Sequence, residues 1–233
     1  LPLEPREDYD AYLSRVNRSV FSPYTQRLVR AATGLILRKP ITVIGDPYWT
    51  DVFVKDVDGC GSDLDEYARR NLICALTYGH SNTLVDFPAP RGARSLAEER
   101  LQNRRPYWIE IDPSNIYGWR LDREVNYGKL IQVRIAEKAV VPDGDFGEKV
   151  YEQIRVIEPG KYRIYRKRET TKDMYTEDDA FAGNFDSPAD EKDYDLVESG
   201  EFSLGEVPLV TVYAGKTDTM TSKPPLLDIA YLN

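Results

Sequence analysis

Residues 130–166 read LIQVRIAEKAVVPDGDFGEKVYEQIRVIEPGKYRIYR, and this stretch decides the fold. Between residues 131 and 135, apolar side chains alternate with polar ones, which is the period of a strand with one buried face. Two further strand-like runs follow, each after a short turn rich in Asp, Gly or Pro. The runs are 150–157 and 162–166, and the turns are Asp143-Gly144-Asp145 and Glu158-Pro159-Gly160. The stretch therefore predicts an antiparallel meander.

The sheet is expected to continue after an acidic interruption. Residues 173–195 are acidic and contain Gly, Ser and Pro, so we expect a mobile loop there. The apolar runs 196–204 and 209–213 then resume the sheet. Residues 217–223 predict a loop, and Pro224-Pro225 opens a further helix.

Two helices are predicted at the N-terminus. Residues 7–20 carry Tyr, Leu and Val side chains at helical spacing. Ser22-Pro23 is typical of an N-cap followed by the first helical residue, and it begins the second helix. Arg38 and Lys39 suit the last turn of that helix, where cations interact favourably with the helix dipole, and Pro40 ends it.

A third helix follows the turn at 58–61. Ser62 is its predicted N-cap, and Gly79 is its predicted C-terminal end. Residues 41–57 are ambiguous between a short strand and a turn of helix. A capping box at Ser95 predicts a fourth, short helix over 96–103. The remaining predicted strands are 83–87, 107–111 and 116–121, and turns are predicted at 112–115 and 126–128.

These elements predict an α+β fold with N-terminal helices packed on an antiparallel or mixed sheet. We expect a single region over residues 1–233, with its parts in chain order. They are N-terminal helices at 1–40, a helix and strand core at 41–125, the β-meander with its acidic loop 173–195 at 126–215, and a loop with the start of a helix at 216–233.

The charge is distributed unevenly along the chain. The whole sequence carries a net charge of −8. Residues 173–201 contain eleven acidic residues and only Lys192 as a basic one, so this segment carries −10 and the remainder +2. Such a balance is not typical of a nucleic-acid-binding protein, which shows a basic stripe. We interpret the acidic segment as a solvated loop; alternatively, it repels DNA or meets a basic patch on a neighbouring subunit.

Compartment and membrane association are also constrained by composition. No apolar run approaches the roughly 20 residues of a membrane helix, so no membrane partner is expected. The N-terminus lacks the apolar core of a signal peptide. The two cysteines, Cys60 and Cys74, indicate free, buried thiols in a reducing compartment instead of a disulfide framework.

Few residues suggest metal or nucleophilic chemistry. His80 is the single histidine, so a His-pair metal site is excluded and a Ser-His-Asp triad would depend on this residue. We interpret it as a surface turn residue after Gly79. Residues 56–62 superficially resemble the start of a calcium loop, but position twelve from Asp56 is Tyr67 and not the required glutamate. A tight turn before a capped helix explains the same residues, and we expect no metal and no cofactor.

Other chemical signals are equally weak. Residues 104–108, Arg-Arg-Pro-Tyr-Trp, mix basic and aromatic side chains and could contact nucleic acid, but helix-end arginines before a half-buried strand explain them better. No phosphate-binding glycine motif is present, so nucleotide hydrolysis is not expected. With 39 acidic residues, carboxylate pairing carries little information, and no residue is assigned a catalytic role. We therefore do not expect an enzyme.

Several short motifs follow one another in a fixed order along nearly the whole chain. They are Tyr9 to Val20 followed by Ser22 to Lys39 with Arg27, Ala31 and Gly34 to Pro40, then Asp58-Gly59-x-Gly61-Ser62-x-Leu64, Tyr78-Gly79, Leu84 to Pro88, Arg105-Pro106-Tyr107, Ile116 to Arg120, Val207 to Val210, and Pro224 to Asn233. No single motif is specific. The ordered set resembles a phage protein family related to the portal proteins of tailed bacteriophages.

The resemblance implies a subunit of the portal ring at one capsid vertex. In that family about twelve copies form a closed ring with heterologous contacts. Its partners would be other copies of itself, the major capsid protein, the terminase, neck and tail adaptors and double-stranded DNA, and it would reside in the virion after assembly in the host cytoplasm. The chain would match the first half of the wing region. Long stem helices would then follow Asn233, so the DNA-facing residues stay unassigned.

Two alternatives belong to other functional classes. The chain is alternatively a different virion building block, such as a neck adaptor or a minor capsid protein that only binds its neighbours. It is alternatively a carboxylate-dependent glycoside hydrolase, which predicts a cleft with two carboxyl groups about 5–10 Å apart.

Overall fold

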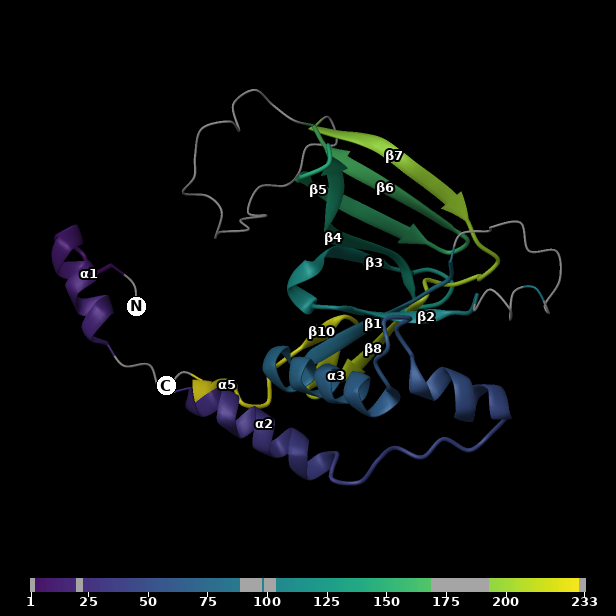
Figure 1. The fold of residues 1–233 in the computed structure, drawn as a ribbon, viewed down its shortest axis with the longest axis horizontal. Helices are drawn as coiled ribbons and strands as arrows, with labels where there is room; N and C mark the ends of the chain where they lie inside the picture. The colour runs from purple at the N-terminus through teal and green to yellow at the C-terminus, as the bar shows by residue number, and fades with distance from the viewer. Residues whose placement is uncertain (1–2, 20–22, 89–97, 99–103, 169–192, 231–233) are drawn as a thin grey trace.

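The computed structural model describes residues 3–19, 23–88, 98, 104–168 and 193–230. The main body has three layers: a helical layer, a three-stranded sheet and a five-stranded sheet (Figure 1). Its helices and helical turns are α1 (Tyr9–Arg18), α2 (Tyr24–Ile36), η1 (Tyr48–Val52), η2 (Phe53–Lys55), α3 (Leu64–Tyr78), η3 (Pro113–Asn115) and α5 (Leu227–Ala230). The chain therefore has an α+β fold, as predicted.

The strands form three antiparallel sheets. They are β1 (His80–Asp86), β2 (Tyr107–Ile111), β3 (Ile116–Leu121), β4 (Leu130–Asp143), β5 (Gly147–Glu158), β6 (Lys161–Lys167), β7 (Tyr194–Glu201), β8 (Leu209–Tyr213), β9 (Lys216–Asp218) and β10 (Thr221–Ser222). The largest sheet has the order β3-β4-β5-β6-β7, which confirms the predicted meander.

Two predictions for the C-terminal part are wrong. The run 209–213 does not rejoin the meander, because β8 pairs with β1 in a separate sheet of order β2-β1-β8. Residues 217–223 do not form a simple loop either, since β9 and β10 pair within them as a short hairpin. The left-handed backbone of Met220 (φ 59°) allows the tight reversal between these two strands.

The hydrophobic core lies between the two larger sheets. Val133, Ile135 and Ile157 point inward from the five-stranded sheet, while Leu84 and Ile111 point toward them from β1 and β2. The alternation in β4 explains this directly, because every second side chain of a strand faces the same side. Truncation of one of the leucine or isoleucine side chains to alanine is expected to remove about 2–5 kcal/mol of stability.

The opposite face of the three-stranded sheet packs on α3 through polar side chains. Asn71 of α3 accepts a hydrogen bond from the Ser81 hydroxyl at 2.7 Å, and the Tyr67 hydroxyl donates to Thr83 at 2.9 Å. All four residues are buried. This polar interface ties α3 to β1 in one register, since each hydroxyl finds its partner only in this alignment.

The ends of the helices differ in detail from the prediction. Asp63, and not Ser62, is the N-cap of α3, and its carboxylate accepts from the Glu66 amide at 2.8 Å. Gly79 ends the helix as predicted, with a left-handed φ of 91°. Helix α2 ends at Ile36, so Arg38 and Lys39 lie beyond its last turn. Within the ambiguous residues 41–57, residues 48–55 form the helical turns η1 and η2 instead of a strand.

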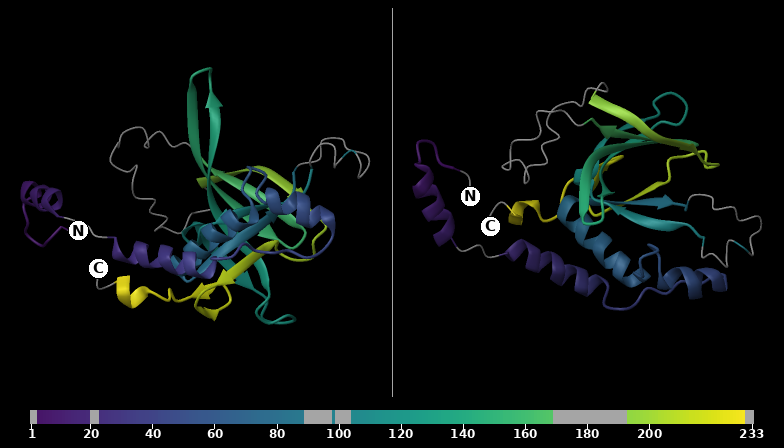
Figure 2. Two further views of the ribbon diagram at one scale, coloured as in Figure 1. Left: turned by 60° about the horizontal axis from the view of Figure 1, so that its bottom comes forward. Right: turned by 45° about the horizontal axis from the view of Figure 1, so that its top comes forward.

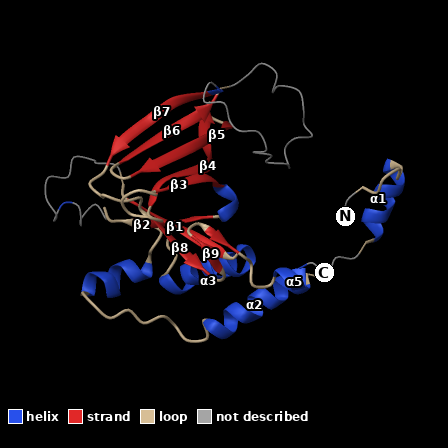
Figure 3. Cartoon of the chain, turned by 180° about the vertical axis from the view of Figure 1, so that it is seen from behind, coloured by secondary structure: helices blue, strands red, loops and turns tan. Residues whose placement is uncertain are grey.

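The two N-terminal helices contact the body very differently. Helix α2 buries Val29 and Thr33 and lies beside α3 (Figure 2). Helix α1 stands apart from the sheets and buries none of its residues (Figure 3). Several predicted features lie outside the described residues: the Ser22 cap, the helix 96–103 apart from Glu98, the acidic loop up to residue 192, and residues 231–233.

Candidate interaction surfaces

His80 lies where α3, β1 and β10 meet. Its Nδ1 is 2.6 Å from the Ser222 hydroxyl, which also donates to the Tyr78 carbonyl at 3.2 Å. Burial lowers the pKa of His80, and the nearby Asp112 only partly opposes this shift. The Asp112 carboxylate instead accepts hydrogen bonds from the Ser114 amide and hydroxyl. The Ser–His contact therefore joins β10 to the end of α3, and the third member of a triad is engaged elsewhere.

The two carboxylates of the loop 56–62 bind arginine side chains and backbone amides instead of a metal cation. Asp58 accepts from the Cys60 and Ser62 amides at 2.9 and 3.1 Å and pairs with Arg70 at 3.2 Å. Asp56 accepts from the Gly61 amide at 2.9 Å. These carboxylate oxygens point at donors of the protein itself, which does not suit calcium. Among the residues that the structure describes, no cluster of three metal-ligating side chains is found.

Protonation of Asp58 is expected to weaken the fold at low pH. Burial opposes ionisation, but the hydrogen bonds from Ser62, Cys60 and Arg70 outweigh it and hold the pKa well below the usual 3.8. The folded pKa is depressed, so this stabilisation is present above about pH 4 and is lost as the pH falls further. We expect Asp58→Asn to cost about 1–2 kcal/mol at pH 7 and to flatten the acid side of the stability profile. Urea titrations between pH 3 and pH 7 measure this; parallel profiles for both proteins would contradict it.

The two cysteines differ in exposure. Cys74 is buried in α3 as predicted, but the same prediction is wrong for Cys60, which is exposed in the turn before that helix. Burial raises the pKa of the Cys74 thiol to about 12, which leaves it protonated and unreactive.

The basic and aromatic cluster 104–108 is mostly absorbed into the fold. The Arg105 side chain is 5% exposed and pairs with Asp56 at 2.6 Å. The Trp108 ring lies 5.1 Å from Phe53 and 5.3 Å from Tyr67, in a small aromatic core. The interpretation of these residues as structural is therefore the one that fits their contacts.

A pair of neighbouring carboxylates near β1 also serves the fold. Asp86 and Glu137 both approach the Arg155 guanidinium, at 3.5 and 2.8 Å. Both carboxylates are therefore engaged in ion pairs with one arginine of the fold.

The face of the five-stranded sheet that points away from the core carries arginines and tyrosines. The register brings Arg134, Val156 and Arg163 into one row and Ala136, Ile154 and Tyr165 into the next. We call this side of the five-stranded sheet, which carries both rows, the outer face. The Arg134 guanidinium lies 5.8 Å from the Tyr117 ring centroid and covers Gly118, where a Cβ atom would collide with it. Six basic and three acidic side chains occupy these positions: Arg120, Arg134, Lys138, Lys161, Arg163 and Lys167 against Glu152, Glu158 and Glu201.

Most charges on the outer face are already paired. Glu158 binds Lys161 and Arg163 at 3.2 and 3.0 Å, and Lys167 lies 3.1 Å from Glu152. Among the described residues no carboxylate pairs with Arg134. Arg134 shares this property with Arg120 and Lys138, for which no ion pair is found among the described residues either. Sequence reasoning missed the outer face, because its members come from strands whose register the sequence does not specify.

Apolar side chains are exposed along the N-terminal helices. On α2, Tyr24, Leu35 and Ile36 are more than 60% exposed. On α1, Tyr9, Leu13 and Val16 of the predicted stripe are exposed, Tyr12 is partly buried, and Val20 lies outside the described residues. Exposed apolar patches of this kind mark contacts with other molecules. No helix within the described ranges is long and apolar enough to cross a membrane.

Comparison with known proteins does not assign the chain to a family. No protein-family model matches the sequence, and no curated protein matches it significantly.

Proposed function

We propose that the chain is a subunit of a portal ring at one capsid vertex of a tailed bacteriophage, through which viral DNA is packaged and ejected and to which the neck and tail attach. The observation that supports this most directly is α1, an amphipathic helix of ten residues that buries none of them. Isolated helices shorter than about 12 residues are marginal in water. Its apolar stripe therefore needs cover from another molecule of an assembly.

Two further observations support the same proposal. The ordered motifs from Arg27 to the C-terminal segment resemble the portal-related family. The polar clusters that could have indicated catalysis, around His80, Asp58 and Arg155, are occupied by contacts within the fold. The expected partners are further copies of the chain, the major capsid protein, the terminase, neck and tail adaptors and the DNA in transit.

Electron microscopy of the protein expressed from its complete gene tests the proposal. We expect closed rings with a central hole. Particles that never form such rings would contradict it, and a monomer that attaches only to a preformed portal would favour a neck adaptor or minor capsid protein.

The contribution of α1 to assembly can be tested with matched variants. We expect Leu13→Ser with Val16→Ser to lower the fraction of rings at least tenfold, because both side chains lie on the exposed stripe. Ser14→Ala with Arg18→Gln, on the opposite side of the same helix, should leave it unchanged. Analytical ultracentrifugation measures the fraction, and equal loss in both variants would contradict a role for the stripe.

A further inference from the structure

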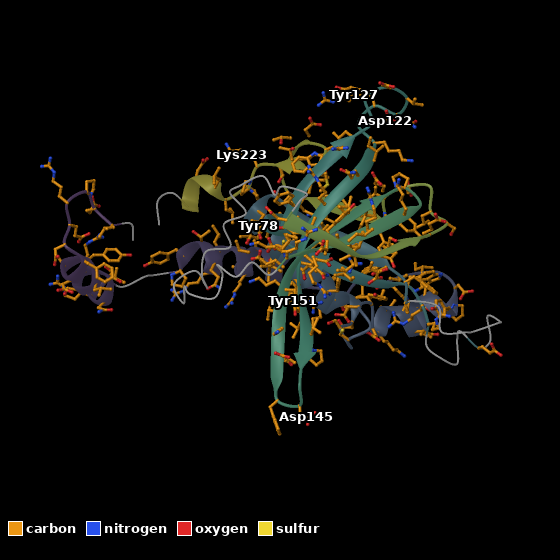
Figure 4. The ribbon with its side chains drawn as sticks, turned by 90° about the horizontal axis from the view of Figure 1, so that it is seen from above. Tyr78, Asp122, Tyr127, Asp145, Tyr151 and Lys223 are labelled. Atoms are coloured by element: carbon orange, nitrogen blue, oxygen red, sulfur yellow. The ribbon has the colours of Figure 1, made fainter. Side chains whose placement is uncertain are left out.

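The strands β4 and β5 continue well beyond the sheet to which they belong. Pairing of β4 with β3 ends at Ile135, and pairing of β5 with β6 ends at Gln153. Residues 137–152 therefore form a two-stranded hairpin, which we call the hairpin arm, and within the described part of the chain no further strand pairs with either of its edges. The hairpin arm projects away from the body with Asp145 at its tip (Figure 2, Figure 4).

An Asp-Gly sequence lies at the tip of the hairpin arm. Asp143 is the last residue of β4 and pairs with Gly147 across the turn. The Asp143 side chain is 58% exposed, and its ion pair with Lys149, at 3.7 Å, is exposed as well. Such a pair does little to fix a carboxyl group in one position. Gly144, the next residue, has a left-handed φ of 74°, and a Cβ atom there would meet nothing within 4 Å.

An Asp-Gly sequence with this freedom rearranges without a catalyst. The glycine nitrogen attacks the neutral carboxyl carbon of the aspartate, the amide proton and the carboxyl hydroxyl leave as water, and a cyclic imide forms. Water then opens the ring, and opening at the main-chain carbonyl gives isoaspartate, in which the chain continues through the side-chain carboxyl group. The water lost is the water regained, so the product is an isomer and no oxidant is needed. Glycine favours the attack because it has no Cβ atom to shield its nitrogen.

The sequence contains one other Asp-Gly pair, Asp58-Gly59, and its contacts oppose this reaction. Gly59 has the same left-handed φ of 74°, but the Asp58 side chain is only 14% exposed. Its carboxylate accepts from the Cys60 and Ser62 amides and pairs with Arg70. These donors stabilise the ionised carboxylate, which is a poor electrophile, and they fix it in one orientation.

The backbone around the two sequences differs in the same direction. To form the imide, an aspartate must leave its folded backbone conformation so that the next nitrogen reaches the side chain. A two-stranded hairpin is marginally stable by itself, and opening the last pair, Asp143 with Gly147, disturbs no third strand. Next to Asp58, in contrast, Val57 is fully buried and exchanges backbone hydrogen bonds with Ser62 and Trp108, each at 2.9 Å.

We propose that Asp143 is a site of spontaneous covalent modification, at which Asp143-Gly144 isomerises to isoaspartate while Asp58-Gly59 stays intact. The product adds one carbon atom to the main chain and leaves the former main-chain carboxyl group as a side branch. Residue 143 then loses its register with Gly147, and the turn that carries the fully exposed Phe146 is displaced. The inference is independent of the proposed ring, because it uses only contacts within one chain.

Peptide mapping of the complete protein, after several weeks at neutral pH and body temperature, tests the proposal. The mass is unchanged, so the isomeric peptides are separated by chromatography and identified by the fragment ions specific to isoaspartate. We expect isoaspartate to accumulate at Asp143 about tenfold faster than at Asp58, because the reacting groups at Asp58 are held in an unproductive arrangement. Asp143→Glu is the matched control: it keeps the charge, but the imide ring would be larger, so no isomer should form at this position.

A sample unfolded in urea separates the effect of the fold from that of the sequence. Both Asp-Gly peptides lose their contacts there, and we expect them to isomerise at similar rates. Absence of isoaspartate at Asp143 in the folded protein would overturn the proposal, whatever the urea sample shows. Equal rates at Asp143 and Asp58 in the folded protein, or the same excess at Asp143 in urea, would show that the contacts of the fold do not select the site.

Discussion

Replacement of Arg105 by alanine is expected to destabilise the fold by about 2–3 kcal/mol, which is less than the loss of a fully buried ion pair because the Asp56 side chain remains 29% exposed. The Arg105 guanidinium is 2.6 Å from the Asp56 carboxylate and lies 5.6 Å from the Phe53 ring centroid. Its loss leaves Asp56 facing the vacated space and removes packing beside the aromatic core. Urea denaturation followed by tryptophan fluorescence measures the change.

Neighbouring substitutions separate charge from geometry at this site. Arg105→Lys keeps the charge but reaches Asp56 with a shorter, single-point donor, so we expect an intermediate loss. Arg104→Ala should cost less, because Arg104 is more exposed than Arg105. A stable Arg105→Ala protein with weakened DNA binding would reverse the structural interpretation and favour nucleic-acid contact through residues 104–108.

Much of the fold could be predicted from the sequence where local signals agree. In the meander, the period of two from Ile131 to Ile135 and the turns at 143–145 and 158–160 all favour the same antiparallel pairing, and β4, β5 and β6 form as expected. Strands β2 and β3 have the predicted limits, because the polar turn Asp112-Pro113-Ser114-Asn115 separates the two runs.

The errors arise where tertiary contacts outweigh local patterns. Strand β8 has the composition of any other strand, and only its packing over the inter-sheet core, next to Val207, selects β1 as its partner. Ser62 and Asp63 are both good N-cap residues. Asp63 is used because the Ser62 amide and hydroxyl already bind Asp58 and Arg70.

The candidate surfaces were the least predictable part of the molecule. The stripe on α1 is visible in the sequence, but an amphipathic helix normally buries its apolar side, and only the structure shows this one exposed. The hairpin arm follows from a difference in strand length, since β4 and β5 outrun β3 and β6. Sequence periodicity predicts strands but not which of them lack a neighbour.

Replacement of Gly79 by alanine is expected to cost about 3 kcal/mol, from about 1–2 kcal/mol for the left-handed backbone and the rest from steric overlap. A Cβ atom at Gly79 would lie 2.6 Å from the Ser222 hydroxyl and 2.9 Å from the Pro224 nitrogen. The overlap would push the backbone at Lys223 and Pro224 away from the end of α3. It would also strain the contact between Ser222 and His80, and thermal denaturation measures the loss.

The displacement of Lys223 and Pro224 matters for the proposed function, because these residues lead into α5. If α5 begins the stem of a portal subunit, Gly79 fixes the point from which that stem leaves the body, and Gly79→Ala should reduce ring formation as well as stability. Gly34→Ala is the matched control: Gly34 is exposed inside α2 with open space around it, so alanine should stabilise the helix by up to about 1 kcal/mol. Equal melting temperatures for the two variants would show that Gly79 is not held by Ser222 and Pro224.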